Sequence, residues 1–194
     1  MVSRRLLVLN FEGVITTNPD PYALFIEKGV QLGLEAAHNL QRERIASPKK
    51  NLLHFISRLF VDLCRQTGLE LQEISERFAA ETHLYPGIRT LLESVHNDES
   101  IDVLIISDFN NAMLEQTLAA KKIALGRMDV VTNNLRMLTY GTYRPVMRSR
   151  SFVDCEYCRS NLCRGNELRT YLQEARQIGV SYFSVRFILR VSFF

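Results

Sequence analysis

The chain of 194 residues suits one domain with room for an insertion, since single domains cluster near roughly 100 to 200 residues. Its composition, 46% hydrophobic and 23% charged, excludes a chain too polar to bury a core. The formal net charge of +3 is small and the basic residues are scattered, which argues against nucleic acid or an anionic membrane surface as the partner.

The sequence also lacks the marks of a membrane or secreted protein. No apolar run approaches the roughly eighteen residues of a membrane span, and Asn10 and Glu12 interrupt the first apolar run too early for a signal peptide. The four cysteines are Cys64 and the cluster Cys155, Cys158 and Cys163, which does not resemble a secreted disulfide framework. We therefore expect a cytoplasmic protein with reduced thiols.

The first half of the chain predicts one strand followed by helices. Residues 5–10, "RLLVLN", are apolar from 6 to 9 without polar alternation, which is typical of a strand buried on both faces of a parallel sheet. The prolines within 18–21 predict a loop, and from about 22 to 82 the pattern is helical. Gly68 is placed to end a helix whose predicted apolar face consists of Leu52, Phe55, Ile56, Leu59, Phe60 and Leu63.

The second half of the chain alternates helices with strands. After a break at 85–87, the predicted elements are a helix over 88–97, a strand over 101–108, a helix over 110–125, a strand over 128–133, a helix over 166–179 and a strand from 181 onward. Residues 135–152 are expected to be irregular and polar, with a hairpin around 139–143.

This alternation predicts an α/β fold with a mostly parallel sheet. Residues 1–20 and 84–194 would form the core, and residues 21–83 would form a helical cap inserted after the first strand. Ligands of open parallel sheets bind beyond the carboxyl ends of the strands. This rule selects Asn10 and Glu12 after the first strand, and Ser107 and Asp108 after the second.

Several stretches together resemble a known family. They are "LLVLNFEGVI", "LYPGIRTLLESVH", "VLIISDFNN", "DVVTN" and "CEYCRSNLCRG". They are similar, in this order, to the haloacid dehalogenase (HAD) phosphatases, and within them to the phosphoethanolamine/phosphocholine and pyridoxal-phosphate phosphatase branch. That branch carries "LLVFDFDxTI", "IISDxN" and "CxxCPxNLCKG". The similarity runs from about residue 4 to residue 188, and it implies a HAD-like Rossmannoid core with a helical cap.

The resemblance assigns roles to the first turn. In such enzymes one aspartate attacks phosphorus, a second aspartate two residues later acts as acid and base, and Mg²⁺ neutralises the phosphoryl charge. Asn10 stands at the nucleophile position and Glu12 at the acid/base position, and both positions belong to the magnesium site. A carboxamide oxygen is a poor nucleophile, and Glu12 is one methylene longer than the aspartate of the family, so this chemistry is expected to be impaired.

The resemblance also implies phosphate and substrate groups. Ser107 matches the hydroxyl that donates to phosphate, near a helix start that favours an anion. Asp108 and, less securely aligned, Asp20 match acidic recognition positions. Arg164 stands where the family uses a lysine; arginine keeps the charge but is larger and more rigid.

The end of the sequence departs most from the family. Arg190 stands near the place of a late metal-binding aspartate, and the family's "GDGGND" is absent, so we expect a core lacking its last part and very low magnesium affinity. The chain is thus expected to be a phosphomonoesterase of small phosphorylated metabolites by ancestry, impaired in catalysis. Two alternatives remain open: a pseudoenzyme that binds a phosphorylated ligand or a protein partner, and an incomplete splice or gene-model product.

Two simpler interpretations accompany these predictions. Without the resemblance, Asn10 would be taken as an asparagine that caps a turn after a buried strand. Zinc at Cys155, Cys158 and Cys163 is disfavoured, because this spacing supplies three ligands without a nearby histidine whereas a structural zinc site takes four.

Overall fold

The computed structural model describes residues 2–17, 22–46, 53–137, 143–146 and 162–188. Its sheet has the strand order β4-β3-β2-β1-β5. The strands are β1 (Val2–Asn10), β2 (Ile101–Asn110), β3 (Met128–Met137), β4 (Tyr143–Val146) and β5 (Val180–Ile188). Among the described strands, only β4 is antiparallel to its neighbour, so the prediction of an α/β fold with a mostly parallel sheet is confirmed.

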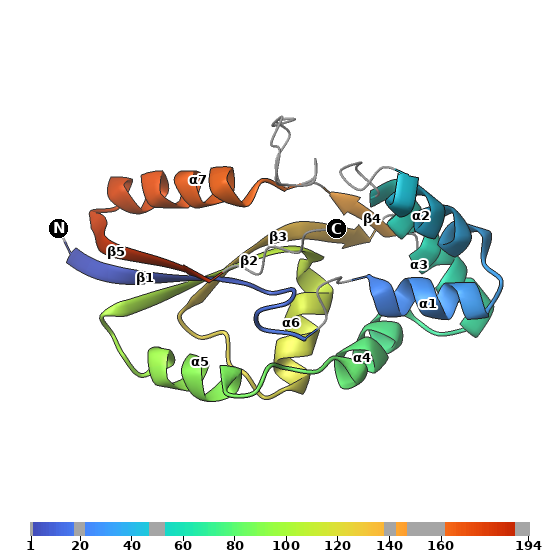
Figure 1. Ribbon diagram of the computed structural model, residues 1–194, viewed down its shortest axis with the longest axis horizontal. Helices are drawn as coiled ribbons and strands as arrows, with labels where there is room; N and C mark the ends of the chain where they lie inside the picture. Colours follow the sequence, from blue (N-terminus) through green and yellow to red (C-terminus); the bar gives the residue numbers. More distant parts are fainter. Residues whose placement is uncertain (1, 18–21, 47–52, 138–142, 147–161, 189–194) are drawn as a thin grey trace.

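The two faces of the sheet are covered by different helices (Figure 1). Helix α7 (Arg164–Gln177) covers one face, and α5 (Ile88–His96) and α6 (Asn111–Ala120) cover the other. Alternate residues of β1 serve the two cores: Leu6 and Val8 pack on the α7 side, and Leu9 packs on the α5 and α6 side. Burial on both faces explains why β1 and β2 appear in the sequence as unbroken apolar runs.

The remaining helices form a helical segment at one end of the sheet. They are α1 (Ala23–Gln31), α2 (Glu35–Ala46), α3 (Leu53–Thr67) and α4 (Leu71–Glu81). Four members of the predicted apolar face are buried, namely Ile56, Leu59, Phe60 and Leu63; Leu52 and the side chain of Phe55 lie outside the described part. Gly68 follows α3 with a φ of +67°, as a helix-ending glycine does.

The helical segment shares its hydrophobic core with the sheet. Phe109, at the end of β2, has its ring centroid 5.0 Å from Tyr22 and 5.1 Å from Phe78. Phe78 in turn stacks on Phe25 of α1 at 4.7 Å. These buried rings fix the helical segment beside the carboxyl ends of β1 and β2, where the site residues were predicted.

Two sequence predictions need correction. Helix α6 ends at Ala120 rather than 125, and Lys122 then takes a positive φ of 57°. The predicted irregular region begins with regular structure: β3 continues to Met137, where it pairs with Tyr143 of β4. The strands flank the expected hairpin, whose turn lies outside the described residues.

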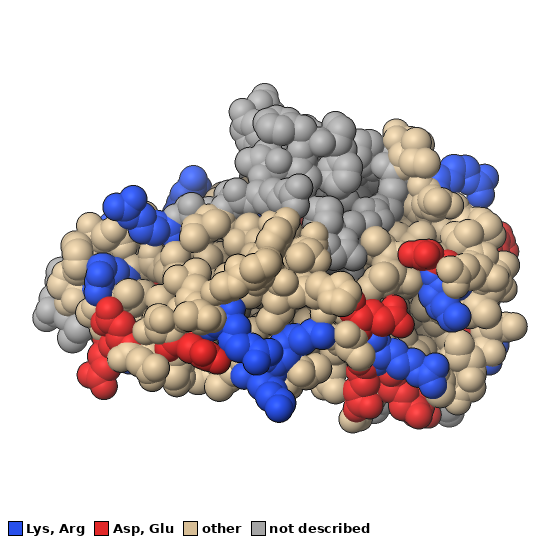
Figure 2. Space-filling view, turned by 60° about the horizontal axis from the view of Figure 1, so that its bottom comes forward, with Lys and Arg blue, Asp and Glu red and all other residues tan. Residues whose placement is uncertain are grey.

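The molecular surface agrees with the small net charge. On the face seen in Figure 2, acidic and basic groups lie interspersed rather than in one field of a single sign. Within the described ranges, every helix is too short or too polar to cross a membrane.

Candidate functional site

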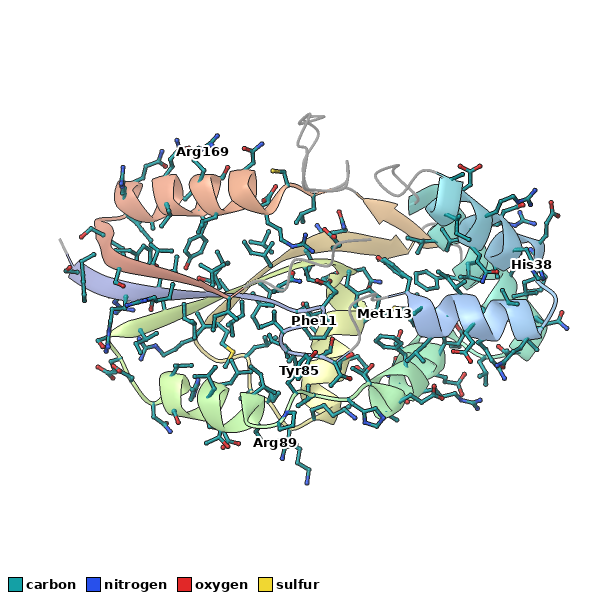
Figure 3. The ribbon with its side chains drawn as sticks, viewed as in Figure 1. Phe11, His38, Tyr85, Arg89, Met113 and Arg169 are labelled. Atoms are coloured by element: carbon teal, nitrogen blue, oxygen red, sulfur yellow. The ribbon has the colours of Figure 1, made fainter. Side chains whose placement is uncertain are left out.

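The structure brings five of the six predicted site residues together. Asn10 ends β1, Ser107 and Asp108 lie near the end of β2, and Glu12 lies in the turn after β1. Arg164 is the first residue of α7 and reaches this edge from the other side. Figure 3 labels Phe11, which lies between Asn10 and Glu12 in the sequence, at the end of the sheet that faces α1. The sixth residue, Asp20, lies outside the described residues.

The carboxamide of Asn10 is held at both ends. Its Nδ2 donates to the backbone carbonyl of Glu12 at 2.6 Å, and its Oδ1 accepts from Nε of Arg164 at 3.0 Å. The side chain is 4% exposed. The bond to Glu12 is the turn-capping bond that an asparagine can make after a strand, and the bond to Arg164 places the oxygen against a positive charge. The carboxamide is therefore buried and engaged through both its nitrogen and its oxygen.

The Glu12 carboxylate is turned toward the end of β2. Its Oε1 accepts from the Ser107 hydroxyl and from the backbone N–H of Phe109, the latter at 3.2 Å. Its Oε2 lies 3.7 Å from Nη2 of Arg164. Burial, and after it the charge of Asp108, raises the pKa of Glu12, while Arg164 and Ser107 act in the opposite direction.

Arg164 connects the two acids. Its Nη2 lies 3.1 Å from Oδ2 of Asp108, in addition to its contacts with Asn10 and Glu12. One guanidinium thus faces two carboxylates, which leaves one net negative charge when both acids are ionised. Its planar set of donors allows contact with three partners at once, which a lysine ammonium would make less readily.

Two further residues support Asp108 from neighbouring elements, and the sequence analysis did not select either. Nδ2 of Asn133 in β3 donates to the Asp108 carbonyl at 2.9 Å, and the Tyr22 hydroxyl donates to it at 3.4 Å. Asn133 ends "DVVTN", one of the stretches that carried the resemblance, so its place at the end of the strand predicted over 128–133 could have drawn attention to it. No comparable signal marked Tyr22.

A backbone donor of the site lies just before the start of α6. The Asn110 side chain caps this helix by accepting from N–H of Met113 at 3.0 Å, and Figure 3 labels Met113 beside the same edge of the sheet. The N–H of Phe109, just before the helix, is shared between Glu12 and the Ser107 hydroxyl oxygen, which is 3.0 Å away. A helix start and a hydroxyl together favour an anionic ligand.

The described residues do not fit the magnesium ion that the resemblance implies. Mg²⁺ needs near-octahedral oxygen ligands, yet Asn10 Oδ1 already accepts from a guanidinium, and the Glu12 carbonyl accepts from Asn10. Within the described ranges, no group of three His, Cys, Asp or Glu side chains could hold a metal. Arg190 lies outside those ranges.

The described residues include one member of the cysteine cluster. Cys163 precedes the first residue of α7 as a half-buried free thiol, whereas Cys155 and Cys158 lie outside the described residues. The disfavoured zinc interpretation therefore stays a prediction.

Comparison with known proteins links the chain to a family. A family model described as Putative Phosphatase matches residues 6–188. A search of curated proteins finds no match.

Solved structures with the same fold include a HAD family hydrolase from Salmonella enterica serovar Typhi (11% identity, TM-score 0.54). The alignment covers 92% of this chain, which spans 54% of the length of that hydrolase. Phosphoserine phosphatase from T. onnurineus, in complex with NDSB-201, aligns with 88% of this chain and 72% of its own length (16% identity, TM-score 0.51). A protein of unknown function from Bordetella pertussis Tohama I aligns with 96% and 82% of the two chains (12% identity, TM-score 0.58). Likeness at these identities shows the fold alone.

Proposed function

The chain belongs to the Putative Phosphatase family within the HAD superfamily, and from this premise we propose that it binds small phosphorylated metabolites without hydrolysing them efficiently. The family implies phosphorylated small molecules as ligands. Phosphoethanolamine, phosphocholine and pyridoxal phosphate are the candidates that the sequence motifs suggest.

One observation carries the proposal: the side chain at the nucleophile position is a carboxamide whose oxygen is engaged by Arg164 at 3.0 Å. A phospho-enzyme needs an anionic oxygen directed at phosphorus, and a neutral amide oxygen bonded to a guanidinium is a much weaker nucleophile. The guanidinium of Arg164 also lies beside the position that a divalent cation would take, and its positive charge would repel that cation.

The groups that recognise phosphate are retained more completely than the nucleophile. The Ser107 hydroxyl, the Arg164 guanidinium and the start of α6 are donors of the kind that bind phosphoryl oxygens. We assign Asp108 to the recognition of a cationic or hydroxyl group on the ligand, because its carboxylate lies beside these donors with one unbonded oxygen within the described structure.

The proposal also treats residues 21–83 as a cap over this site. Tyr22 and Phe78 from that segment pack against Phe109, so ligand selection would depend on how the helical segment sits on the sheet. The core would consist of residues 1–20 and 84–194.

Two measurements on the purified chain test this function. Phosphate release from the three candidate metabolites with millimolar Mg²⁺ should equal that of a buffer blank. The same ligands should raise the melting temperature in a saturable manner, because a ligand that binds only the folded state stabilises it. Ser107→Ala should abolish this rise, and Ser94→Ala, at an exposed serine of α5, should leave it unchanged.

The outcomes are distinct. A turnover of about 1 s⁻¹ or more, within the ordinary range of enzymes, would refute the absence of efficient hydrolysis. A melting temperature that does not respond to any of the ligands at tens of millimolar would refute binding.

A further inference from the structure

Three hydrogen-bond donors converge at the site from two elements, and we name them the oxyanion cradle: the Ser107 hydroxyl, the backbone N–H of Phe109 and the guanidinium of Arg164. The first two act on the same oxygen of Glu12, and the third faces its other oxygen at 3.7 Å. Both donors of the first pair belong to β2, and Arg164 begins α7.

This donor set suits an oxyanion better than it suits a catalytic acid. A hydroxyl, a backbone N–H at a helix start and a guanidinium are the groups that proteins direct at the oxygens of phosphate. A side chain meant to exchange a proton with a leaving group would need one oxygen open to the ligand. In Glu12, which is 4% exposed, Oε1 accepts both hydrogen bonds, and Oε2 is turned toward Arg164, 3.7 Å from its Nη2.

We infer that the carboxylate of Glu12 is the resident ligand of the oxyanion cradle, so that a phosphoryl group binds only when Glu12 leaves. The inference rests on the proposed function, since it concerns the phosphate-binding groups of that same site. The site is self-occupied at rest, and its affinity for phosphate is set by competition with an internal anion.

The length of the side chain makes this occupation possible. Glu12 starts from the turn after β1, where the carboxamide of Asn10 fixes its backbone carbonyl. From there, the glutamate reaches across to the end of β2, and an aspartate, one methylene shorter, would end about 1.5 Å earlier. The glutamate that replaces the family's aspartate at position 12 therefore has the length needed to reach Ser107 and Phe109.

The charges agree with competition rather than joint occupancy. Glu12 and Asp108 share one guanidinium, and each keeps one oxygen that accepts no hydrogen bond within the described structure. When both acids are ionised, an entering phosphate would add negative charge to a site that already has an excess of it. Removing the carboxylate of Glu12 would leave the guanidinium to balance Asp108 alone and would release the two donors on β2.

The test is titration of inorganic phosphate into ¹⁵N-labelled protein at constant ionic strength, followed through the Phe109 amide resonance. We expect Glu12→Ala to bind phosphate at least about tenfold more tightly than the wild type, because a buried like charge is removed. The double variant Glu12→Ala/Ser107→Ala should lose most of this gain. Glu93→Ala, which removes the same charge at an exposed position on α5, should bind as the wild type does.

A second variant is needed because Glu12→Ala could fail to fold. Glu12→Gln keeps the size of the side chain and an oxygen for both donors, and removing the charge alone should still tighten phosphate binding, by less than Glu12→Ala. If the wild type and both Glu12 variants bind phosphate equally at the Phe109 amide, the cradle is not self-occupied, although the proposed binding function stands. If no variant binds phosphate, the inference and the proposed binding function both fail.

Discussion

Asn10 differs from the aspartate of the family at one side-chain atom, a nitrogen in place of an oxygen, and this nitrogen makes a hydrogen bond in the structure. Its Nδ2 donates to the Glu12 carbonyl, a bond that an ionised aspartate could not make. The same residue accepts from Arg164 through Oδ1. The carboxamide therefore has two positive roles in the fold, in addition to being the wrong group for attack on phosphorus.

Asn10→Asp should not restore phosphatase activity. The new carboxylate would pair with Arg164, Glu12 would remain on Ser107, and the lost bond should lower the free energy of unfolding by about 1–3 kcal/mol, because a buried carbonyl would face an anion. Phosphate release from phosphoethanolamine with Mg²⁺ and urea unfolding measure the two effects. Asn97→Asp, at an exposed site after α5, is the control; ordinary enzymatic turnover by Asn10→Asp would refute our account of the site.

At the scale of elements, close approach of α1 to its neighbours depends on Gly29. A Cβ atom built there would lie 2.6 Å from Cβ of Ala37 in α2 and 2.7 Å from Cδ1 of Leu59 in α3. The Ala37 atom is attached directly to the backbone, so it cannot swing aside. Gly165, near the start of α7, is the opposite case, because no described atom lies within 4 Å of its built Cβ.

These two glycines predict opposite responses to the same substitution. Gly29→Ala should destabilise the protein by about 1–3 kcal/mol, since overpacking outweighs the intrinsic helical preference for alanine. Gly165→Ala should stabilise it by about 0.5–1 kcal/mol, since only that preference acts. Urea unfolding midpoints at unchanged slope measure both. Shifts in the same direction would show that the packing of α1 is looser than described.

Helix α7 is joined to the sheet through two tyrosines. The Tyr171 hydroxyl donates to Asp129 of β3 at 2.6 Å, and the Tyr182 hydroxyl of β5 donates to Asp102 of β2 at 3.0 Å. The two rings stack at a centroid distance of 6.3 Å. Burial, followed by the hydrogen bond to Asp129, raises the pKa of Tyr171 far above its ordinary value of 10.

Because the pKa of Tyr171 is raised, the free energy of unfolding should fall as the pH rises above 10. The neutral form is favoured more in the folded chain than in the unfolded one, so this stabilisation is complete below pH 10 and declines as the pH rises above it. Tyr171→Phe should cost about 1–2 kcal/mol at pH 7 and make the decline above pH 10 shallower. Urea unfolding at several pH values tests this, with Tyr85→Phe as the control. An unchanged slope in Tyr171→Phe would count against the network.

At the scale of the whole molecule, the strands that lie in the middle of the sheet were the most predictable. Burial on both faces requires unbroken apolar runs, and β1 and β2 have them. The extension of β3 to Met137 was not predictable in this way. Its residues 134–137 gain strand structure from antiparallel pairing with β4, a partner that the local pattern of "NLRM" does not reveal.

The same contrast holds for the site. The rule for strand ends selected Asn10, Glu12 and Ser107 from type and position. Arg164 came from the resemblance, since no local pattern predicts a contact between residues 154 positions apart. The Phe109 donor escaped both routes, because a backbone N–H has no residue type, and only the folded turn shows where it points.

One hydrophobic cluster runs from the sheet through the helical segment, so the chain should unfold as one unit. Phe78 lies at the junction, 6% exposed, with its ring centroid 4.7 Å from that of Phe25 and 5.1 Å from that of Phe109. Phe78→Ala should lower the free energy of unfolding by about 3–5 kcal/mol, the usual cost of deleting a buried ring. That is a large part of the roughly 5–15 kcal/mol that stabilises an ordinary domain.

The unfolding of Phe78→Ala should remain a single transition, because α4 loses its ring contacts with α1 and with the end of β2 together. Far-UV circular dichroism and tyrosine fluorescence, in a chain without tryptophan, should give coincident urea curves. Phe183→Ala, whose side chain is 68% exposed on β5, should change stability by no more than about 0.5 kcal/mol. Loss of helical signal before the tyrosine signal would instead identify the helical segment as a separately stable unit.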